Sequence, residues 1–331
     1  MTITPIKNIP NRVPLAHLPT PIEKMERLSA TLKTNLYLKR DDYTGSEVSG
    51  NKIRKLEYAI CEALSLGAKT LITCGGIQSN HARATVAAAR KLGLGVHLVL
   101  RSEPNPLIEG NYLMNQLMGA KITLLPADVF ASEYEQVMEK LKSEYDALGT
   151  PAYILPIGAS NGIGNFGYYH AFEEILDQEK ALGLTFDTIV CTVGSGGTYG
   201  GLFLGNYLSE SNRQIIGFNI SSTAEAFKDD ISKIVNESLR RLELPETAKT
   251  SDIAIIDGYA GLGYALSTKE EMAFIMEIAQ SEGLILDPVY TGKAFRGLIR
   301  EIEKGQFNAS QNILFIHTGG LMGFVPKYFT D

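Results

Sequence analysis

The chain has 331 residues, of which 44% are hydrophobic and 21% are charged, and its formal net charge is −6. This length exceeds the usual size of one hydrophobic core and predicts two closely packed lobes. The acidic balance, with Lys and Arg scattered, argues against a nucleic-acid partner, and no segment reaches the roughly 18 apolar residues that a membrane span requires.

The cysteines and the first ten residues indicate the cellular compartment of the protein. Cys61, Cys74 and Cys191 are odd in number and form no CxxC pair, which favours a reducing compartment. The first ten residues lack a basic start followed by an apolar segment, so we expect no secretion signal. We therefore expect a cytoplasmic protein, with a symmetric homodimer as the default assembly.

Short apolar runs, glycine-bearing loops and helical patterns alternate along the chain, which predicts an α/β fold with parallel sheets. The expected strands are residues 36–40, 70–74, 96–100, 122–125, 153–157, 188–192, 215–220 and 313–316. The expected helices are residues 81–92, 111–118 and 132–148, with further helical patterns after residues 52 and 198. The glycine-rich segment 159–167 is the expected crossing between the lobes.

A lysine at the start of a helical pattern is the first candidate for chemistry. Lys52 follows Ser49-Gly50-Asn51 and precedes the pattern that begins at Ile53. A helix N-terminus disfavours a cation, and a lysine with a larger neutral fraction can form a Schiff base. Gly50 would let the backbone approach a flat ring, and Asn51 could bond a ring substituent. Taken alone, an ordinary surface lysine is the commoner interpretation.

The loop before the predicted helix 81–92 offers hydrogen-bond donors. Gln78, Ser79 and Asn80 lie just before that helix. Backbone N–H groups and polar side chains at a helix N-terminus bind anions such as a carboxylate. A simple N-cap is the alternative interpretation, and the sequence leaves both open.

A glycine-rich loop follows the strand expected at 188–192. It reads Gly194-Ser195-Gly196-Gly197-Thr198, and glycines let N–H groups point at a phosphate without obstruction by a Cβ atom. The two hydroxyls and the following helix start would add further attraction for an anion. The spacing matches neither a P-loop nor a dinucleotide fingerprint, so a phosphate monoester fits better than a nucleotide. A plain tight turn is the alternative.

Three of the expected strands are followed by glycine pairs, at 75–76, 196–197 and 319–320. Ligands of open α/β sheets bind beyond the carboxyl ends of the strands. We therefore expect the three loops to converge on one site.

Five segments, in this order, resemble the family of D-cysteine desulfhydrases and 1-aminocyclopropane-1-carboxylate (ACC) deaminases. These enzymes depend on pyridoxal phosphate (PLP) and have the tryptophan-synthase-β-like fold, which is also called fold type II. The resemblance extends from about residue 18 to residue 323. The matching segments are 49–57, 75–81, 194–198, 287–294 and 317–320.

The resemblance implies a two-domain α/β fold with open, twisted, mostly parallel sheets. The large, PLP-binding domain would comprise residues 1–54 plus 166–331, and the small domain residues 55–165. Lys52 would hold PLP as a Schiff base, and Asn80 would be the partner of its ring hydroxyl. The phosphate would be bound by Gly194, Ser195, Gly196, Gly197 and Thr198. The substrate carboxylate would be bound by Gln78, Ser79 and Asn80.

Tyr264 and Tyr290 match the family's two active-site tyrosines, and Tyr290 would also contact the substrate. A phenol near a helix start can exchange protons with a substrate, so both tyrosines and Ser79 are candidate catalytic residues beside Lys52. The segment Gly263-Tyr264-Ala265 departs from the family's usual Gly-Tyr-Gly.

Thr291 and Thr318 would lie beside the cofactor ring. They help to predict which of the family's two reactions the chain catalyses. ACC deaminases generally carry an acidic residue and a leucine there, whereas D-cysteine desulfhydrases carry hydroxyl residues. A carboxylate beside the pyridine nitrogen strengthens the ring as an electron sink, and a threonine does so less well. Opening an unactivated cyclopropane needs more electron withdrawal than expelling hydrosulfide, so the two threonines favour β-elimination.

The sequence thus predicts a lyase that converts D-cysteine to pyruvate, hydrogen sulfide and ammonia. Cysteate and β-chloroalanine are further candidate substrates, and ACC deamination is the alternative enzymatic reaction. A PLP-binding protein without turnover and a nucleotide-binding oxidoreductase are the remaining interpretations. The five histidines show no metal-ligand spacing, so no metal is expected.

Overall fold

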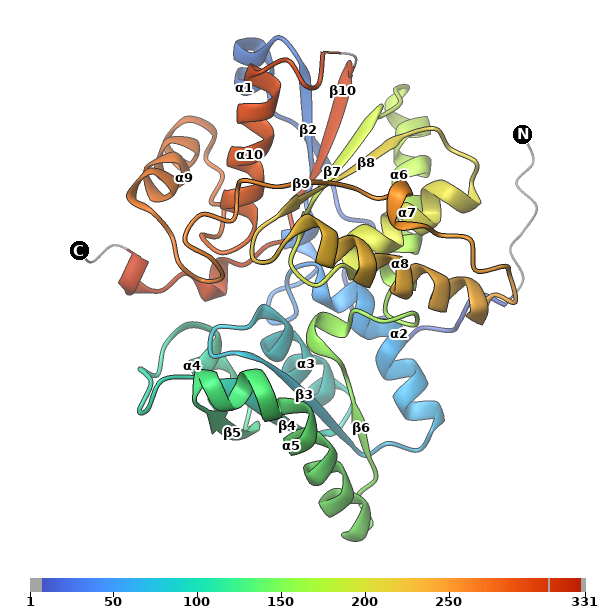
Figure 1. The fold of residues 1–331 in the computed structure, drawn as a ribbon, viewed down its shortest axis with the longest axis vertical. Coiled ribbons are helices and arrows are strands. Elements are labelled where there is room, and N and C mark those ends of the chain that lie inside the picture. The colour runs from blue at the N-terminus through green and yellow to red at the C-terminus, as the bar shows by residue number, and fades with distance from the viewer. Residues whose placement is uncertain (1–7, 309, 329–331) are drawn as a thin grey trace.

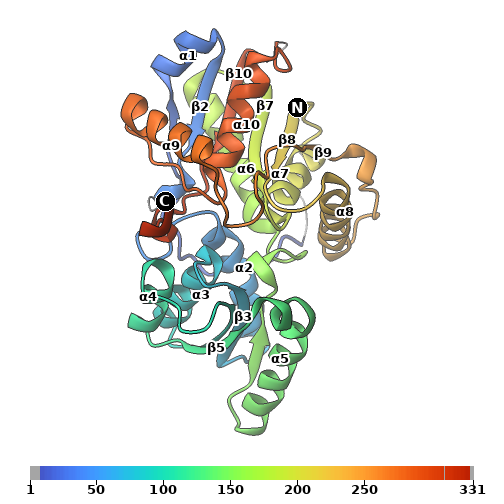
Figure 2. The same ribbon diagram turned by 60° about the vertical axis from the view of Figure 1, so that its left-hand side comes forward.

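The structure of the chain is a computed structural model that describes residues 8–308 and 310–328. Two sheets form two halves, one above the other in Figure 1 and again in the rotated view of Figure 2. Residues 1–7, 309 and 329–331 belong to the predicted large domain but lie outside the described residues. The stretch predicted to lack a secretion signal is therefore described only from residue 8 onward.

The upper half in Figure 1 contains a six-stranded sheet in the order β1-β2-β10-β7-β8-β9. β1 runs antiparallel to β2, and the other neighbouring pairs are parallel. The strands are β1 (Ile22–Lys24), β2 (Asn35–Lys39), β7 (Thr188–Val193), β8 (Gln214–Asn219), β9 (Ala254–Ile256) and β10 (Asn312–Ile316). The helices are α1 (Glu26–Leu32), α6 (Phe166–Leu182), α7 (Gly197–Leu208), α8 (Ala224–Arg241), α9 (Lys269–Glu282) and α10 (Thr291–Glu303).

Side chains on both faces of the central strand β7 are buried. Ile189 and Cys191 of β7 pack in one core with α6 and α7, whereas Val190 packs in a second core with α9 and α10. Helices that cover both faces of a parallel sheet leave the loops at the carboxyl ends of its strands as the place for a ligand.

The lower half contains a four-stranded parallel sheet in the order β5-β4-β3-β6. Its strands are β3 (Thr70–Gly76), β4 (Gly95–Arg101), β5 (Lys121–Leu125) and β6 (Ala152–Ile154). Its helices are α2 (Lys52–Ser65), α3 (Asn80–Lys91), α4 (Gly110–Leu117) and α5 (Ala127–Ala147). Short 3-10 turns lie at η1 (Asp41–Tyr43), η2 (Ile157–Ala159), η3 (Thr250–Asp252), η4 (Leu321–Gly323) and η5 (Pro326–Tyr328).

The predicted strands and helices are confirmed to within a few residues, with two larger differences. The strand expected at 153–157 ends at Ile154, because Pro156 has no N–H for the ladder and a 3-10 turn follows it. α5 begins at Ala127, before the predicted residue 132, and Asp128 in its first turn suits the positive end of the helix dipole.

The predicted domain division remains a proposal, to which the structure adds detail. One sheet contains β1, β2 and β7 to β10, and the other contains β3 to β6. The proposed boundary between residues 54 and 55 falls inside α2, so the chain passes between the halves through a helix. The proposed boundary between residues 165 and 166 coincides with the start of α6.

A buried polar cluster fixes the start of α2. Arg54 Nη2 lies 2.8 Å from Asp41 Oδ1, and Arg54 Nη1 lies 2.9 Å from Glu174 Oε2 on α6. Lys39, the last residue of β2, pairs with the same Glu174. Burial acts to raise the pKa of Asp41, but Arg54 and Lys39 outweigh it and the net pKa is lowered. The first turn of α2 is thus tied to β2 and α6 of the six-stranded half.

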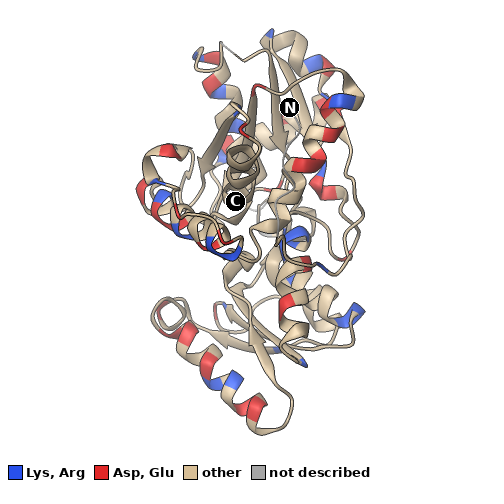
Figure 3. Ribbon diagram, turned by 90° about the vertical axis from the view of Figure 1, so that its right-hand side faces the viewer, with Lys and Arg blue, Asp and Glu red and all other residues tan. Residues whose placement is uncertain are grey.

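Positions of Lys and Arg alternate with positions of Asp and Glu along the ribbon, as Figure 3 shows. On α5, for example, Lys142 Nζ lies 2.6 Å from Asp146 Oδ2 one turn further along the helix. Among the residues that the structure describes, no helix is both long enough and apolar enough to cross a membrane.

Candidate active site

One cavity, of about 190 Å³, lies where the two halves meet, at the carboxyl ends of β3, β7 and β10. Its lining includes Gly75, Gly76, Gly196 and Gly319, so the predicted convergence of the three glycine-bearing loops is confirmed. The polar and charged residues of the lining are Asn51, Lys52, Ser79, Asn80, His81, Arg101, Thr192, Ser195, Thr198, Tyr264, Tyr290 and Thr318.

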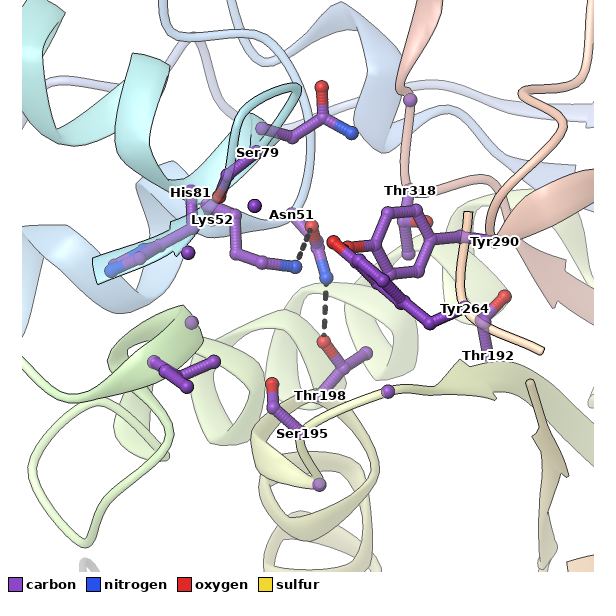
Figure 4. Close-up of a pocket in the computed structure, with 18 of the residues that line it drawn as sticks. Asn51, Lys52, Ser79, His81, Thr192, Ser195, Thr198, Tyr264, Tyr290 and Thr318 are labelled. Atoms are coloured by element: carbon purple, nitrogen blue, oxygen red, sulfur yellow. Dashed lines mark hydrogen bonds between the residues drawn. The ribbon is translucent and has the colours of Figure 1, made fainter. Parts of the chain in front are cut away.

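Lys52, the first residue of α2, lines this cavity and points toward the rings of Tyr264 and Tyr290 (Figure 4). Its Nζ donates to Asn51 Oδ1 at 3.0 Å and lies 5.7 Å from the centre of the Tyr290 ring. Burial lowers the pKa of Lys52 from 10.5 to about 8, against the opposing effect of Asp287. The sequence attributed a destabilised ammonium to the helix start, whereas burial is the largest cause of the lowered pKa of Lys52.

The loop before Lys52 requires glycine at position 50. Gly50 has a φ of +102°, and a Cβ atom there would lie 2.7 Å from the carbonyl oxygen of Thr318. Asn51 N donates to the same carbonyl at 3.3 Å. The absence of a Cβ atom at position 50 therefore allows this loop to lie directly against the segment that follows β10.

The lowered pKa of Lys52 predicts unusual reactivity in the ligand-free protein. Only a neutral amine is nucleophilic, and at pH 7 the neutral fraction is roughly 300 times larger for a pKa of about 8 than for 10.5. We expect trace acylation of Lys52 by an amine-specific reagent to rise with pH through a midpoint near 8. Competitive labelling read by mass spectrometry measures this, and a rise only near the ordinary lysine value of about 10.4 would contradict it.

Residues 194–198 form a cup at the start of α7, which begins at Gly197. The first N–H groups of a helix have no partner within it, so they are available to an anion. Gly196 has a φ of +80°, a conformation that favours glycine. Thr198 Oγ1 accepts from Asn51 Nδ2 at 2.9 Å, and Ser195 Oγ lies 2.8 Å from Ser160 Oγ. The cup therefore faces the residue that precedes Lys52.

Lys55 lies behind the cup, and no sequence pattern singled it out. Its Nζ donates to Ser160 Oγ at 3.0 Å, and a Cβ atom on Gly197 would lie 3.1 Å from it. Burial and the neighbouring Lys52 lower the pKa of Lys55 well below 10.5, and among the described residues it has no carboxylate partner. A buried amine of this kind is stabilised by an anion. The available signal was its position three residues after Lys52, on the same helix face.

The loop at 78–80 contains the N-cap that the sequence left open, and its binding of an anion stays a prediction. Ser79 is the N-cap of α3, and its Oγ accepts from Ala82 N at 3.1 Å. Ser79 and Asn80 also line the cavity, where the N-terminus of α3 favours an anion. Asn80 Oδ1 accepts from Asn111 Nδ2 at 2.9 Å, which leaves the Asn80 amide nitrogen as a donor.

Three of the predicted residues do not line this cavity: Gly197, and the two polar residues Gln78 and Thr291, whose side chains are held elsewhere. The Gln78 amide is held at the start of α4, where it donates to Glu109 O at 3.1 Å and accepts from Asn111 N at 2.8 Å. The Thr291 hydroxyl is held at the start of α10, where it donates to Asp287 Oδ1 at 2.7 Å. Gln78 borders an adjoining cavity, and the ligand contacts of both residues stay predictions.

Tyr264 and Tyr290 lie together at one side of the cavity (Figure 4). The two hydroxyl oxygens are 2.7 Å apart and the ring centres 5.9 Å apart. Burial raises the pKa of both phenols, that of Tyr290 well above 10. Both side chains are therefore protonated at neutral pH and share one hydrogen bond. Such a pair can donate a proton to a group bound in front of Lys52.

Two buried polar atoms of the lining, His81 Nδ1 and Thr192 Oγ1, have no hydrogen-bond partner among the described residues. Burial, with a further effect of Lys52 and Lys55, lowers the pKa of His81 well below 6.5, so its ring is neutral. Buried polar groups are normally hydrogen-bonded, so these atoms and Lys55 fit a polar, anionic occupant. In the described part of the chain, no three His, Cys, Asp or Glu side chains gather to hold a metal ion.

Comparison with known proteins agrees with this geometry. The family model for pyridoxal-phosphate dependent enzymes matches residues 13–319. The chain is 41% identical over 322 residues to the mitochondrial bifunctional D-cysteine desulfhydrase/1-aminocyclopropane-1-carboxylate deaminase of Arabidopsis thaliana, covering 95% of this chain and 79% of that protein. It is 38% identical over 314 residues to the D-cysteine desulfhydrase of Yersinia enterocolitica, covering 93% of each protein.

A solved structure shows the same architecture. The crystal structure of an ACC deaminase homologue matches with a TM-score of 0.87 and 38% identity, covering 95% of this chain and 93% of that one. The predicted fold class, with two mostly parallel sheets as in fold type II PLP enzymes, is therefore confirmed.

Proposed function

The chain belongs to the family of pyridoxal-phosphate dependent enzymes, and from this premise we propose that it eliminates the β-substituent of a small amino acid. The proposed first substrate is D-cysteine, which with one water gives pyruvate, hydrogen sulfide and ammonia. The proposal is carried by the arrangement of Lys52, the cup and the tyrosine pair around one cavity.

The residues of the cavity fit PLP. Lys52 would bond its aldehyde carbon, and Asn80 and Thr318 would contact its ring. Its phosphate would occupy the cup, where the anion would favour the protonated, positively charged form of the buried Lys55. When bound, PLP would supply an aldehyde for the substrate amine and a conjugated ring able to take up the electron pair that is left when the α-proton is removed.

The chain's own side chains would position the substrate and move the proton. Lys52 Nζ is the first candidate base for the α-proton, because its lowered pKa leaves a large neutral fraction. Ser79 or Tyr290 would assist, and the Tyr264–Tyr290 hydrogen bond would keep a proton at the Tyr290 oxygen for the departing hydrosulfide. Ser79 and Asn80, at the start of α3, would orient the substrate carboxylate.

One feature of the lining favours β-elimination over ACC deamination. Among the described residues that line the cavity there is no carboxylate, and the hydroxyl of Thr318 is present instead. The nearby Asp287 carboxylate is occupied by the N–H groups of residues 289–291. A ring without an adjacent carboxylate is a weaker electron sink, which suits a good leaving group better than a cyclopropane. ACC deamination and elimination from cysteate are the alternatives.

A substrate panel tests the proposal. Purified protein loaded with PLP is offered D-cysteine, L-cysteine, ACC and other small amino acids, and the release of oxoacid and sulfide is measured. We expect D-cysteine to give pyruvate and sulfide in equal amounts, with the highest kcat/KM of the panel. A higher kcat/KM for 2-oxobutyrate release from ACC would favour the alternative, and the absence of any oxoacid would contradict the proposal.

We also propose that the protein is a cytoplasmic homodimer. Cys74 and Cys191 are buried, and all three cysteines are free thiols, which suits a reducing compartment. Cyclic dimers are the commonest symmetric assemblies of soluble proteins.

A further inference from the structure

A cationic side chain that none of these roles uses also lines the cavity. Arg101 is the last residue of β4 and lies opposite Gly76 in the register of the sheet. Its guanidinium carbon is 5.3 Å from the centre of the Tyr264 ring. Arg101 borders both the cavity that contains Lys52 and an adjoining cavity of about 320 Å³.

Arg101 differs from the buried arginines of the same half in its lack of partners. Arg54 pairs with two carboxylates, and Arg83 donates to the carbonyl oxygens of Glu47 and Ser49. Within residues 8–308 and 310–328, the Arg101 side chain has no hydrogen bond or ion pair, and its contact is with the face of Tyr264. Its five N–H donors are therefore left for a ligand.

The other anion sites of the cavity are already assigned. The cup would take the cofactor phosphate, and the start of α3 would take the substrate carboxylate. Arg101 lies on the wall that separates the two cavities. That wall consists of Gly76, Asn80, Arg101, Tyr264 and Tyr290, which line both. The adjoining cavity thus supplies room for a substituent that extends beyond the β-carbon.

We propose that Arg101 binds an oxoanion carried on the β-carbon of the substrate, so that the substrate class includes amino acids with a sulfonate or sulfate at that position. A planar guanidinium presents paired donors that match two oxygens of such a group. The inference rests on the proposed function, because an elimination is the reaction in which the β-substituent must be held and released.

For cysteate the chemistry balances without an outside oxidant or reductant. The Cβ–S bond breaks and its electron pair leaves with sulfite, while the α-proton passes to Lys52. One water then converts the remaining carbon skeleton to pyruvate and ammonia. Arg101 would bind the sulfonate before this step and the sulfite after it.

Two other roles for Arg101 lead to different results. A cation beside Tyr264 could tune the tyrosine pair, and its removal would then lower kcat for every substrate. A guanidinium that bound the α-carboxylate would, on removal, raise KM for every substrate equally. If Arg101 binds an anionic β-substituent, its removal would raise KM more for substrates whose β-substituent is charged than for those whose β-substituent is neutral.

The test compares cysteate with β-chloroalanine, whose β-substituent is uncharged, each as separate D and L enantiomers. Arg101→Met removes the charge at similar length, and Arg101→Lys keeps the charge without the paired donors. We expect Arg101→Met to raise KM for cysteate about 10- to 100-fold more than KM for β-chloroalanine. Arg101→Lys should lie between, and the matched control Arg27→Met, at an exposed arginine on α1, should change neither value.

Equilibrium binding gives a second measurement that is independent of turnover. In a Lys52→Ala background, calorimetric titration should show that Arg101→Met weakens cysteate binding by a similar factor relative to β-chloroalanine. Equal losses for the two substrates, a loss confined to kcat, or no loss would overturn the assignment of Arg101 and leave the proposed function standing. Failure of the unaltered enzyme to release oxoacid from cysteate, β-chloroalanine or D-cysteine would overturn both.

Discussion

Replacing Lys52 with alanine is expected to abolish turnover of D-cysteine and to leave the protein folded. The amine is the group proposed to bond the cofactor and the first candidate base, and removal of such a group lowers kcat on the order of 10⁴-fold or more. The side chain contributes little to stability, since its Nζ donates one hydrogen bond among the described residues, to Asn51, and its charge is disfavoured by burial.

Two variants and one chemical measurement sharpen this test. Lys52→Arg should be as inactive as Lys52→Ala, because a guanidinium stays protonated, whereas Lys69→Ala, at an exposed lysine, should retain full activity. Borohydride reduction followed by mass spectrometry should leave the cofactor mass on the peptide that contains residue 52. Substantial activity in Lys52→Ala, or the mass on another lysine, would remove Lys52 from the mechanism. Thermal unfolding midpoints check that each variant is folded.

Replacing Asp41 with alanine is expected to lower the free energy of unfolding by about 3–5 kcal/mol. Asp41 is fully buried and accepts from Arg54 Nε at 2.9 Å and from Arg54 Nη2 at 2.8 Å. Without it, Arg54 and Lys39 face the single carboxylate of Glu174, which leaves one buried positive charge uncompensated. The loss should exceed that from any exposed ion pair of the protein.

Asp177→Ala provides the matched control for this loss. Asp177 lies on α6, as Glu174 does, and its carboxylate is 2.8 Å from Lys180 Nζ, with 77% of each side chain exposed. Exposed pairs contribute about 0–1 kcal/mol. Urea unfolding of both variants, followed by circular dichroism, measures the difference, and equal destabilisation by the two substitutions would show that the buried cluster has no special role.

The sheets and the place of Lys52 in the cavity could be predicted from the sequence because their signals are local. Alternating apolar strands and glycine-bearing loops are patterns of a few residues, and they place the ends of β3, β7 and β10 at one site. Lys52 and the cup each lie at a helix start. There, a short motif determines both the backbone conformation and the local electrostatic field of the helix dipole.

Roles that depend on distant partners could not be predicted in this way. Lys55 Nζ bonds Ser160, which is 105 residues away, and the lack of partners for Arg101 is visible only in the folded chain. Gln78 and Thr291 were assigned by their places in motifs, yet their polar groups are held by neighbouring helix starts. A motif fixes which residues are near a site, and the surrounding hydrogen bonds decide which of them face it.

The continuous helix that joins the halves has a consequence for how such a site can change. Because Arg54 ties the first turn of α2 to Asp41 and Glu174, the backbone of Lys52 keeps its place relative to β2 and α6. Accommodation of differently shaped substrates then falls to the ends of β3 and β4, which belong to the other half. The proposed cofactor-bonding nitrogen of Lys52 and the proposed substituent-binding Arg101 therefore lie on separate supports, and the second can diverge while the first is retained.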